Sequence, residues 1–269
     1  MTYLSVLNMN FILYQLFLPF ILSAIIVVVI MFIAEKYGTK IGGILGTLPS
    51  TIVIALIFLA INQDINFSSE AAAVIPAELG INILFLVIFA ILIYRSILIA
   101  FLTSLSIWTI LSFLILYLNL NNIYISITIF IISLISALII LENKKKIKSI
   151  KNVDFHFNKK KIVIRGIMAG IVISIAILLS NIGAIISGIF SVFPAIIIST
   201  MLISYREYGP NFAAGMAKSM IIGISSVAVY ATSVHFFYPI YDISLGSIIS
   251  YLASISITFL LLIIKDKIQ

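Results

Sequence analysis

The sequence predicts an all-α polytopic membrane protein of about nine transmembrane helices, arranged as two inverted four-helix repeats joined by a connector helix. Three observations support this prediction: the composition, the placement of the basic loops and a repeated motif. Of 269 residues, 63% are hydrophobic and 9% are charged, whereas soluble domains are about half apolar and about a quarter charged. Stretches of about 20 apolar residues, the length that crosses the hydrocarbon core as a helix, recur along nearly the whole chain.

Nine spans follow from the hydrophobic runs and the turn and charge signals between them. They cover approximately residues 11–34, 41–62, 72–94, 97–118, 122–141, 162–180, 182–204, 212–236 and 243–264. The first span is too long for the apolar region of a cleaved signal peptide, so we expect it to be retained.

Basic residues predict the orientation, because short loops that carry them stay in the cytoplasm. Lysine and arginine follow only odd-numbered spans: Lys36 and Lys40, Arg95, the linker 144–161, Arg206, and Lys265 with Lys267. This predicts an outside N-terminus and a cytoplasmic C-terminus in the cell (plasma) membrane. Half of the basic residues behind the net charge of +7 lie in that linker, so a membrane-flanking loop explains the charge and no nucleic-acid partner is expected.

A small-residue ladder ending in proline occurs twice, as GGILGTLPST at 42–51 and SGIFSVFPAI at 187–196. A shift of 145 positions places the first copy on the second, with Pro49 on Pro194. The expected organisation is a first repeat at 1–120, a connector helix and lysine-rich loop at 121–161, and a second repeat at 162–269, all in one membrane domain. The small residues expected to pack helices closely are Gly38, Gly42, Gly43, Gly46, Gly183, Ser187 and Gly188.

Five crossings separate the two copies, so they run in opposite directions through the membrane. Inverted repeats are a recurring design of secondary transporters, with the binding site near mid-membrane at interrupted helices. Proline interrupts a helix because it lacks an N–H and its ring clashes with the preceding turn. The resulting candidates for a substrate or ion path are Thr47, Pro49, Ser50, Thr51, Ser191 and Pro194. Simple helix packing and ordinary proline kinks are the alternatives.

Two ionisable residues, Glu78 and Lys218, are expected within the hydrocarbon, where function is the default hypothesis. Glu78 is expected about 10 Å below the outer surface and Lys218 about 12 Å above the inner one. We interpret them as a charge relay for a proton or an ionic substrate. Alternatively, a helix that begins at Pro76 leaves Glu78 in the interface, and Lys218 snorkels to the headgroups.

Three further polar residues have structural interpretations beside functional ones. Trp108 is expected to pack in the core rather than line a cavity. Gln15 is expected to donate an interhelical hydrogen bond. His235, beside aromatic residues, is either a pH-sensitive gate or part of an interfacial aromatic belt.

The sequence lacks the patterns of a membrane enzyme. It has no cysteine, its two histidines are far apart and its aspartates are isolated. Thiolate sites, HExxH-type zinc sites and the paired aspartates that hold magnesium are therefore not expected. We expect no enzyme activity, no metal and no cofactor.

The ladder ending in Phe193-Pro194 and the following Ser204-Tyr205-Arg206-Glu207-Tyr208-Gly209-Pro210 resemble the GlpM-like small four-helix membrane proteins, over about residues 183–223 with a weaker echo at 38–51. The resemblance implies a fused pair of oppositely oriented units. Such an arrangement is similar to that of the drug/metabolite transporters, although the single connector helix differs from their ten-helix pattern. It implies neither a substrate nor catalytic residues.

The function predicted is a secondary transporter, ion-coupled or facilitative, of a small molecule. The alternatives are a translocator of lipid or polyprenyl phosphate and a membrane scaffold that transports nothing. Expected partners are the lipid bilayer and a small-molecule or ionic substrate, and an oligomer is compatible with the sequence.

Overall fold

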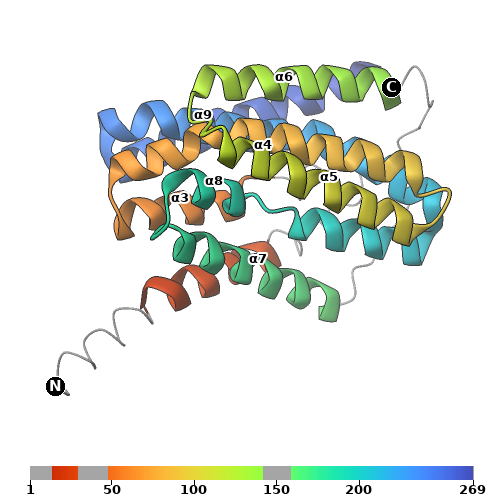
Figure 1. Cartoon of the computed structure of the whole chain (residues 1–269), viewed down its shortest axis with the longest axis horizontal. Coiled ribbons are helices and arrows are strands. Elements are labelled where there is room, and N and C mark those ends of the chain that lie inside the picture. Colours follow the sequence, from red (N-terminus) through yellow and green to blue (C-terminus); the bar gives the residue numbers. More distant parts are fainter. Residues whose placement is uncertain (1–13, 30–47, 142–158, 269) are drawn as a thin grey trace.

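The computed structural model describes residues 14–29, 48–141 and 159–268. Figure 1 shows helices that run mostly along the long axis of the molecule. All regular structure in these ranges is helical. The predictions for Thr47, Gly38, Gly42, Gly43 and Gly46 lie outside the described residues.

The described helices follow the chain in the order that the hydrophobic runs suggest. They are an N-terminal helix Tyr14–Val29, α3 (Ser50–Asn62), α4 (Ile65–Leu92), α5 (Ile97–Tyr117), α6 (Ile123–Ile139), α7 (Lys159–Leu179), α8 (Ala184–Ser191) and α9 (Ala195–Ile268). Helix α9 is not straight, because its backbone leaves helical geometry at Gly209 and at Tyr241–Asp242. It therefore has three segments, 195–208, 210–240 and 243–268.

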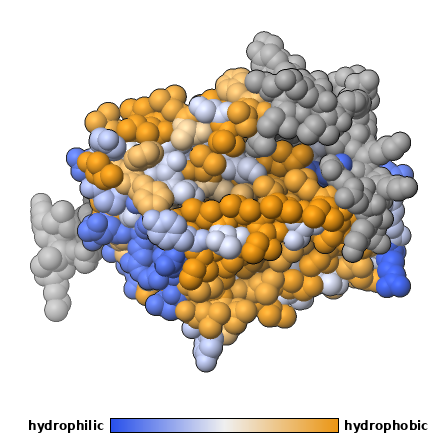
Figure 2. Space-filling model, turned by 90° about the horizontal axis from the view of Figure 1, so that it is seen from above, coloured by the Kyte–Doolittle hydropathy of each residue, from blue (hydrophilic) through white to orange (hydrophobic). Residues whose placement is uncertain are grey.

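Four of the helical stretches are long and apolar enough to cross a membrane: α4, α5, most of α7, and the stretch through α8 and α9. Figure 2 shows hydrophobic side chains over the middle of the molecule and hydrophilic ones gathered toward its two ends. This distribution fits a protein embedded in a bilayer, where an apolar belt meets the lipid tails and polar ends meet the headgroups.

Helix α5 has the side-chain distribution of a lipid-facing helix. Its buried stripe includes Ser104, Trp108 and Ser112, whereas Ile110 and Phe113 are about two-thirds exposed. Polar and small residues thus face the protein, and large apolar ones face outward. Lipid provides no hydrophobic drive for helix association, so small and polar residues at the contacts are what a membrane bundle requires.

Helix α4 forms the centre of the fold and packs against α3, α5, α6, α8 and α9. It begins at Ile65, earlier than the predicted residue 72, because Asp64 caps it by accepting a hydrogen bond from the Phe67 N–H at 2.7 Å. Pro76 lies inside the helix, so the alternative in which the helix begins there is wrong. Glu78 is consequently mid-helix, about 20 Å from either end.

Small residues bring helices together at two places. A side chain on Gly188 of α8 would overlap the Ala71 carbonyl oxygen and Val74 of α4. Gly183 has no described atom near its missing side chain and precedes α8 instead of lying on its packed face, so the packing prediction is wrong for Gly183. A second set of small residues, which was not predicted, lies on α7. This helix packs on the N-terminal helix through Gly166, Gly170 and Ser174.

We predict that Gly188→Ala lowers the free energy of unfolding by about 1–3 kcal/mol, because the added methyl group must push α8 away from the α4 backbone. Thermal unfolding of the purified protein in detergent measures the change. Gly183→Ala is the matched control and is expected to be nearly neutral. Equal stability of the two variants would contradict the close α4–α8 contact.

Candidate functional site

Each repeated proline directly precedes the start of a helix, and Pro194 also follows the end of one. Helix α3 begins at Ser50 with Pro49 at its N-cap and has no side-chain cap. Helix α8 ends at Ser191, and α9 begins at Ala195 directly after Pro194. The predicted seventh span is therefore two helices separated by a short non-helical stretch, residues 192–194, as expected for a missing N–H at Pro194.

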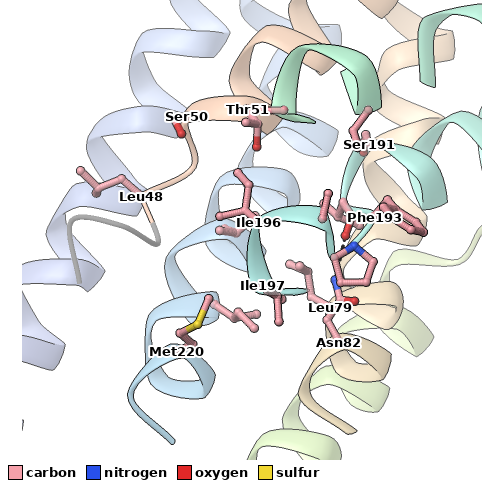
Figure 3. Close-up of a pocket in the computed structure, with 17 residues that line it drawn as sticks. Leu48, Ser50, Thr51, Leu79, Asn82, Ser191, Phe193, Ile196, Ile197 and Met220 are labelled. Atoms are coloured by element: carbon pink, nitrogen blue, oxygen red, sulfur yellow. Dashed lines mark hydrogen bonds between the residues drawn. The ribbon is translucent and has the colours of Figure 1, made fainter. Parts of the chain in front are cut away.

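The start of α3 and the break between α8 and α9 meet at one cavity of about 100 Å³. One water molecule needs about 10–15 Å³ of such space, so the cavity has room for several waters or a small solute. Figure 3 shows Ser50 and Thr51 on one side of it and Ser191, Phe193 and Ile196 on the other. The described lining comprises Leu48, Ser50, Thr51, Leu79, Asn82, Ala169, Val172, Ser191, Val192, Phe193, Pro194, Ala195, Ile196, Ile197, Met220, Ile224 and Val227.

Asn82 on α4 holds the interrupted backbone in place. Its Nδ2 donates a hydrogen bond of 2.8 Å to the Val192 carbonyl oxygen, which no helix turn can satisfy. The side chain is 1% exposed, and its Oδ1 has no partner among the described residues. Asn82 therefore joins the chain break to the central helix and leaves one buried acceptor at the cavity.

Glu78 lies one turn before Asn82 on α4 and is completely buried. Its Oε1 accepts a hydrogen bond of 2.7 Å from the Ser112 hydroxyl of α5, and its Oε2 has no partner in the described part of the chain. Trp108 lies one turn before Ser112, and its indole meets the Phe193 ring edge-on with centroids 5.0 Å apart. A buried carboxyl group and the cavity are thus connected through Trp108 and Phe193.

The described contacts of Glu78 do not include Lys218. The Glu78 carboxyl accepts a hydrogen bond from Ser112, and the Trp108 side chain lies beside it. Lys218 is half-buried on α9. At 3.6 residues per turn it lies on roughly the opposite face from Met220, Ile224 and Val227, which line the cavity. The relay between the two charges stays a prediction.

The hydroxyl groups near the two prolines divide into two sets. Ser50 and Thr51 line the cavity. Ser191 also lines it but donates to the Gly188 carbonyl oxygen, and Ser199 and Thr200 both donate to that of Ile196. The second set satisfies backbone acceptors beside the break. Ser187 is buried in α8 and does not line the cavity.

His235 joins two helices away from the cavity. Its ring Nδ1 lies 2.9 Å from the Ser69 carbonyl oxygen, and the Ser69 hydroxyl donates to the His235 carbonyl oxygen at 2.8 Å. Its ring also contacts Phe236, with centroids 5.0 Å apart. The histidine thus connects the first turns of α4 to the second segment of α9.

Sequence reasoning missed Asn82 and Arg165. An amide in the middle of an apolar span was the available signal for Asn82, since buried polar groups require partners. Arg165 is 1% exposed on α7, within the predicted sixth span, and was overlooked because the adjacent lysine-rich linker explained the charge. In residues 14–29, 48–141 and 159–268, no three His, Asp or Glu side chains gather as a metal site requires.

Comparison of the chain with protein-family models, with curated proteins and with solved structures finds no match. The resemblance to the GlpM-like proteins therefore stays a prediction.

We predict that Asn82→Leu destabilises the protein by about 1–3 kcal/mol, because the Val192 carbonyl oxygen would be buried without a partner. Asn181→Leu is the matched control. Asn181 also donates to a backbone carbonyl, that of Leu178, but it is exposed, so its loss should cost about 0.5 kcal/mol or less. Thermal unfolding in detergent compares the two, and similar losses would refute the role of Asn82 at the break.

Proposed function

We propose that the protein is a secondary transporter of a small molecule, with its binding site in the cavity between the two proline interruptions. One observation carries the proposal. Equivalent positions of the two repeats, Pro49 and Pro194, start helices at the same cavity, although 145 residues separate them in the chain. Broken helices at a repeat interface are the usual construction of a site in secondary transporters.

The proposal includes nine spans, with the second repeat inverted relative to the first and the N-terminus outside the cell membrane. The three segments of α9 support this count, because its departures from helical geometry at Gly209 and at Tyr241–Asp242 fall at the predicted turns. The basic residues after odd-numbered spans support the orientation.

Within this proposal, Glu78 is the candidate residue for binding the coupling ion. Charged groups inside a membrane are costly and usually serve transport or proton relay. Its unpartnered oxygen and its connection to the cavity through Trp108 and Phe193 support this role.

A lipid translocator is the second candidate, and one observation favours it. An apolar groove lined by Met168, Ile171, Ile175 and Phe190 adjoins the cavity and shares Val172, Phe193 and Ala195 with it. The described lining of cavity and groove contains no lysine or arginine, which a phosphate headgroup would require. A small solute is therefore the better fit.

We predict that a cysteine replacing Thr51 reacts with a small hydrophilic methanethiosulfonate reagent applied from either side of the membrane, because a transporter opens its site to each side in turn. The natural chain has no cysteine, so labelling reports this position alone. Reaction is followed by a mass shift after inside-only and outside-only treatment.

Ile110→Cys is the control for this labelling. Ile110 is 66% exposed on the outer face of α5, where lipid tails surround it, so a hydrophilic reagent should not modify it. If Thr51→Cys were as unreactive as Ile110→Cys from both sides, the protein would be a scaffold without a water-accessible site.

We predict that the emission of Trp108, the single tryptophan, changes with pH in the purified protein and that Glu78→Gln removes the change. The glutamine keeps an acceptor for Ser112 but cannot ionise, so the electric field at the indole no longer depends on pH. Glu70→Gln, an exposed substitution on the same helix, is the control and should leave the titration intact. A pH response that survives Glu78→Gln would exclude Glu78 as its source.

A further inference from the structure

We propose that a pocket between the start of α5 and the end of the first segment of α9 binds one anionic phospholipid, with the phosphate at Arg206 and an acyl chain between the two helices. This inference goes beyond the proposed function. The described lining of this α5–α9 pocket shares no residue with that of the cavity. The lipid is therefore a bound partner and not the transported solute.

The α5–α9 pocket is formed by the first turns of α5 and the last turns of the segment 195–208. Figure 1 shows both stretches at the same end of the bundle, on the right. The basic residues predict that this end is cytoplasmic, because Arg95 and Arg206 each follow an odd-numbered span. The pocket has a volume of about 230 Å³. Its described lining residues are Ile97, Leu98, Phe101, Leu202, Tyr205 and Arg206.

The apolar walls of the pocket continue the lipid-facing surface of α5. Leu98 lines the pocket and is 63% exposed, and Leu102, one turn further along the same face, is 53% exposed. Ile97 and Phe101 form the inner wall, where both pack against the hydrophobic core. A pocket that is continuous with a lipid-facing surface meets lipid tails, so an acyl chain is the occupant that these walls fit.

Arg206 gives the pocket a positive charge at the end of the helix, where headgroups lie. Its side chain is exposed, and no carboxylate is among the described lining residues. Glu207 projects about 100° away around the helix. A guanidinium group matches the geometry of a phosphate, and a tyrosine such as Tyr205 is typical of the headgroup level. Basic pockets between membrane helices on the cytoplasmic side bind anionic headgroups, so the charge favours an anionic lipid over a zwitterionic one.

A lipid in this pocket would join α5 to the α9 segment that starts at the cavity. Helix α5 carries Trp108, and the α9 segment lines the cavity with Ala195, Ile196 and Ile197. A ligand that binds only the folded protein stabilises it. We therefore expect the bound lipid to raise the midpoint of thermal unfolding.

Two lipids with the same acyl chains test the proposal. Delipidated protein in a neutral detergent is titrated with dioleoyl phosphatidylglycerol, which is anionic, or with dioleoyl phosphatidylcholine, which is zwitterionic. Native mass spectrometry counts the retained lipids, and thermal unfolding measures the stabilisation. We expect one phosphatidylglycerol to be retained about fivefold more tightly than phosphatidylcholine. Equal retention of the two lipids would overturn the proposal. So would binding of soluble glycerol 3-phosphate as tightly as the lipid, because that result indicates an anion site without an acyl chain.

Arg206→Gln and the matched control Arg95→Gln locate the site. Arg95 is exposed in the turn before α5 and is not among the described lining residues, so both variants lose one charge at the same end of the molecule. Arg206→Gln should weaken the retention of phosphatidylglycerol about tenfold, because a charge-assisted hydrogen bond is lost. Arg95→Gln should weaken it about threefold or less, because its charge acts only through water.

Equal losses in the two variants would show that the general positive charge of this end attracts the lipid, and would reject the α5–α9 pocket as the site. If Arg206→Gln did not fold, the comparison of the two lipids on the natural chain and on Arg95→Gln would still decide. A loss of the preference for phosphatidylglycerol in Arg95→Gln would then overturn the proposal, and its persistence would support it.

Discussion

The hydrogen bond from Asn82 to the Val192 carbonyl oxygen is the interaction on which the site depends. An interrupted helix is tolerated at membrane depth only where its backbone polar groups find other partners. At this break, side chains and short backbone turns satisfy the carbonyl groups of residues 188–190 and 192. Helix α4 supplies the partner of the Val192 carbonyl oxygen through Asn82, and the break it holds forms one wall of the cavity.

The same rule organises the rest of the bundle. Buried hydroxyl groups bond mainly to backbone carbonyls, as Ser254 does to the Ser226 carbonyl oxygen and Ser68 to that of Leu56. Large apolar side chains are left for the outer surface of α5 and α6. Such a bundle is held by close packing and internal hydrogen bonds, because moving apolar groups from lipid to protein gains little. Several buried polar atoms have no described partner, among them the Ser104 and Ser187 hydroxyl groups, and Glu78 differs from these in being a carboxyl group.

Much of the helical fold could be predicted from the sequence, because hydrophobic runs report helix existence directly. The ends of α5 and α6 fall close to the predicted spans, where Ser96 and Asn122 cap the helices. The start of α4 was missed because residues 65–71 are polar enough to resemble a loop yet pack as a helix. The repeat predicted the break at Pro194 and the residue, Pro49, after which α3 begins. It gave no information about Asn82, since the partner of a freed carbonyl group comes from a distant helix.

Proline directly before α3 and α9 explains where these two helices begin at the cavity. A glycine or serine at the same place permits a bend but can continue the helix, so the next N–H groups would bond to the preceding turn. Proline ends the preceding helix and allows a new one to begin, because its missing N–H is not needed at that position. The N–H groups of Ser50 and Ala195, which follow the two prolines, each bond to the carbonyl oxygen two residues back, that of Leu48 or Phe193. The equivalent prolines, 145 residues apart in the sequence, thus place the start of a helix at two walls of the same cavity.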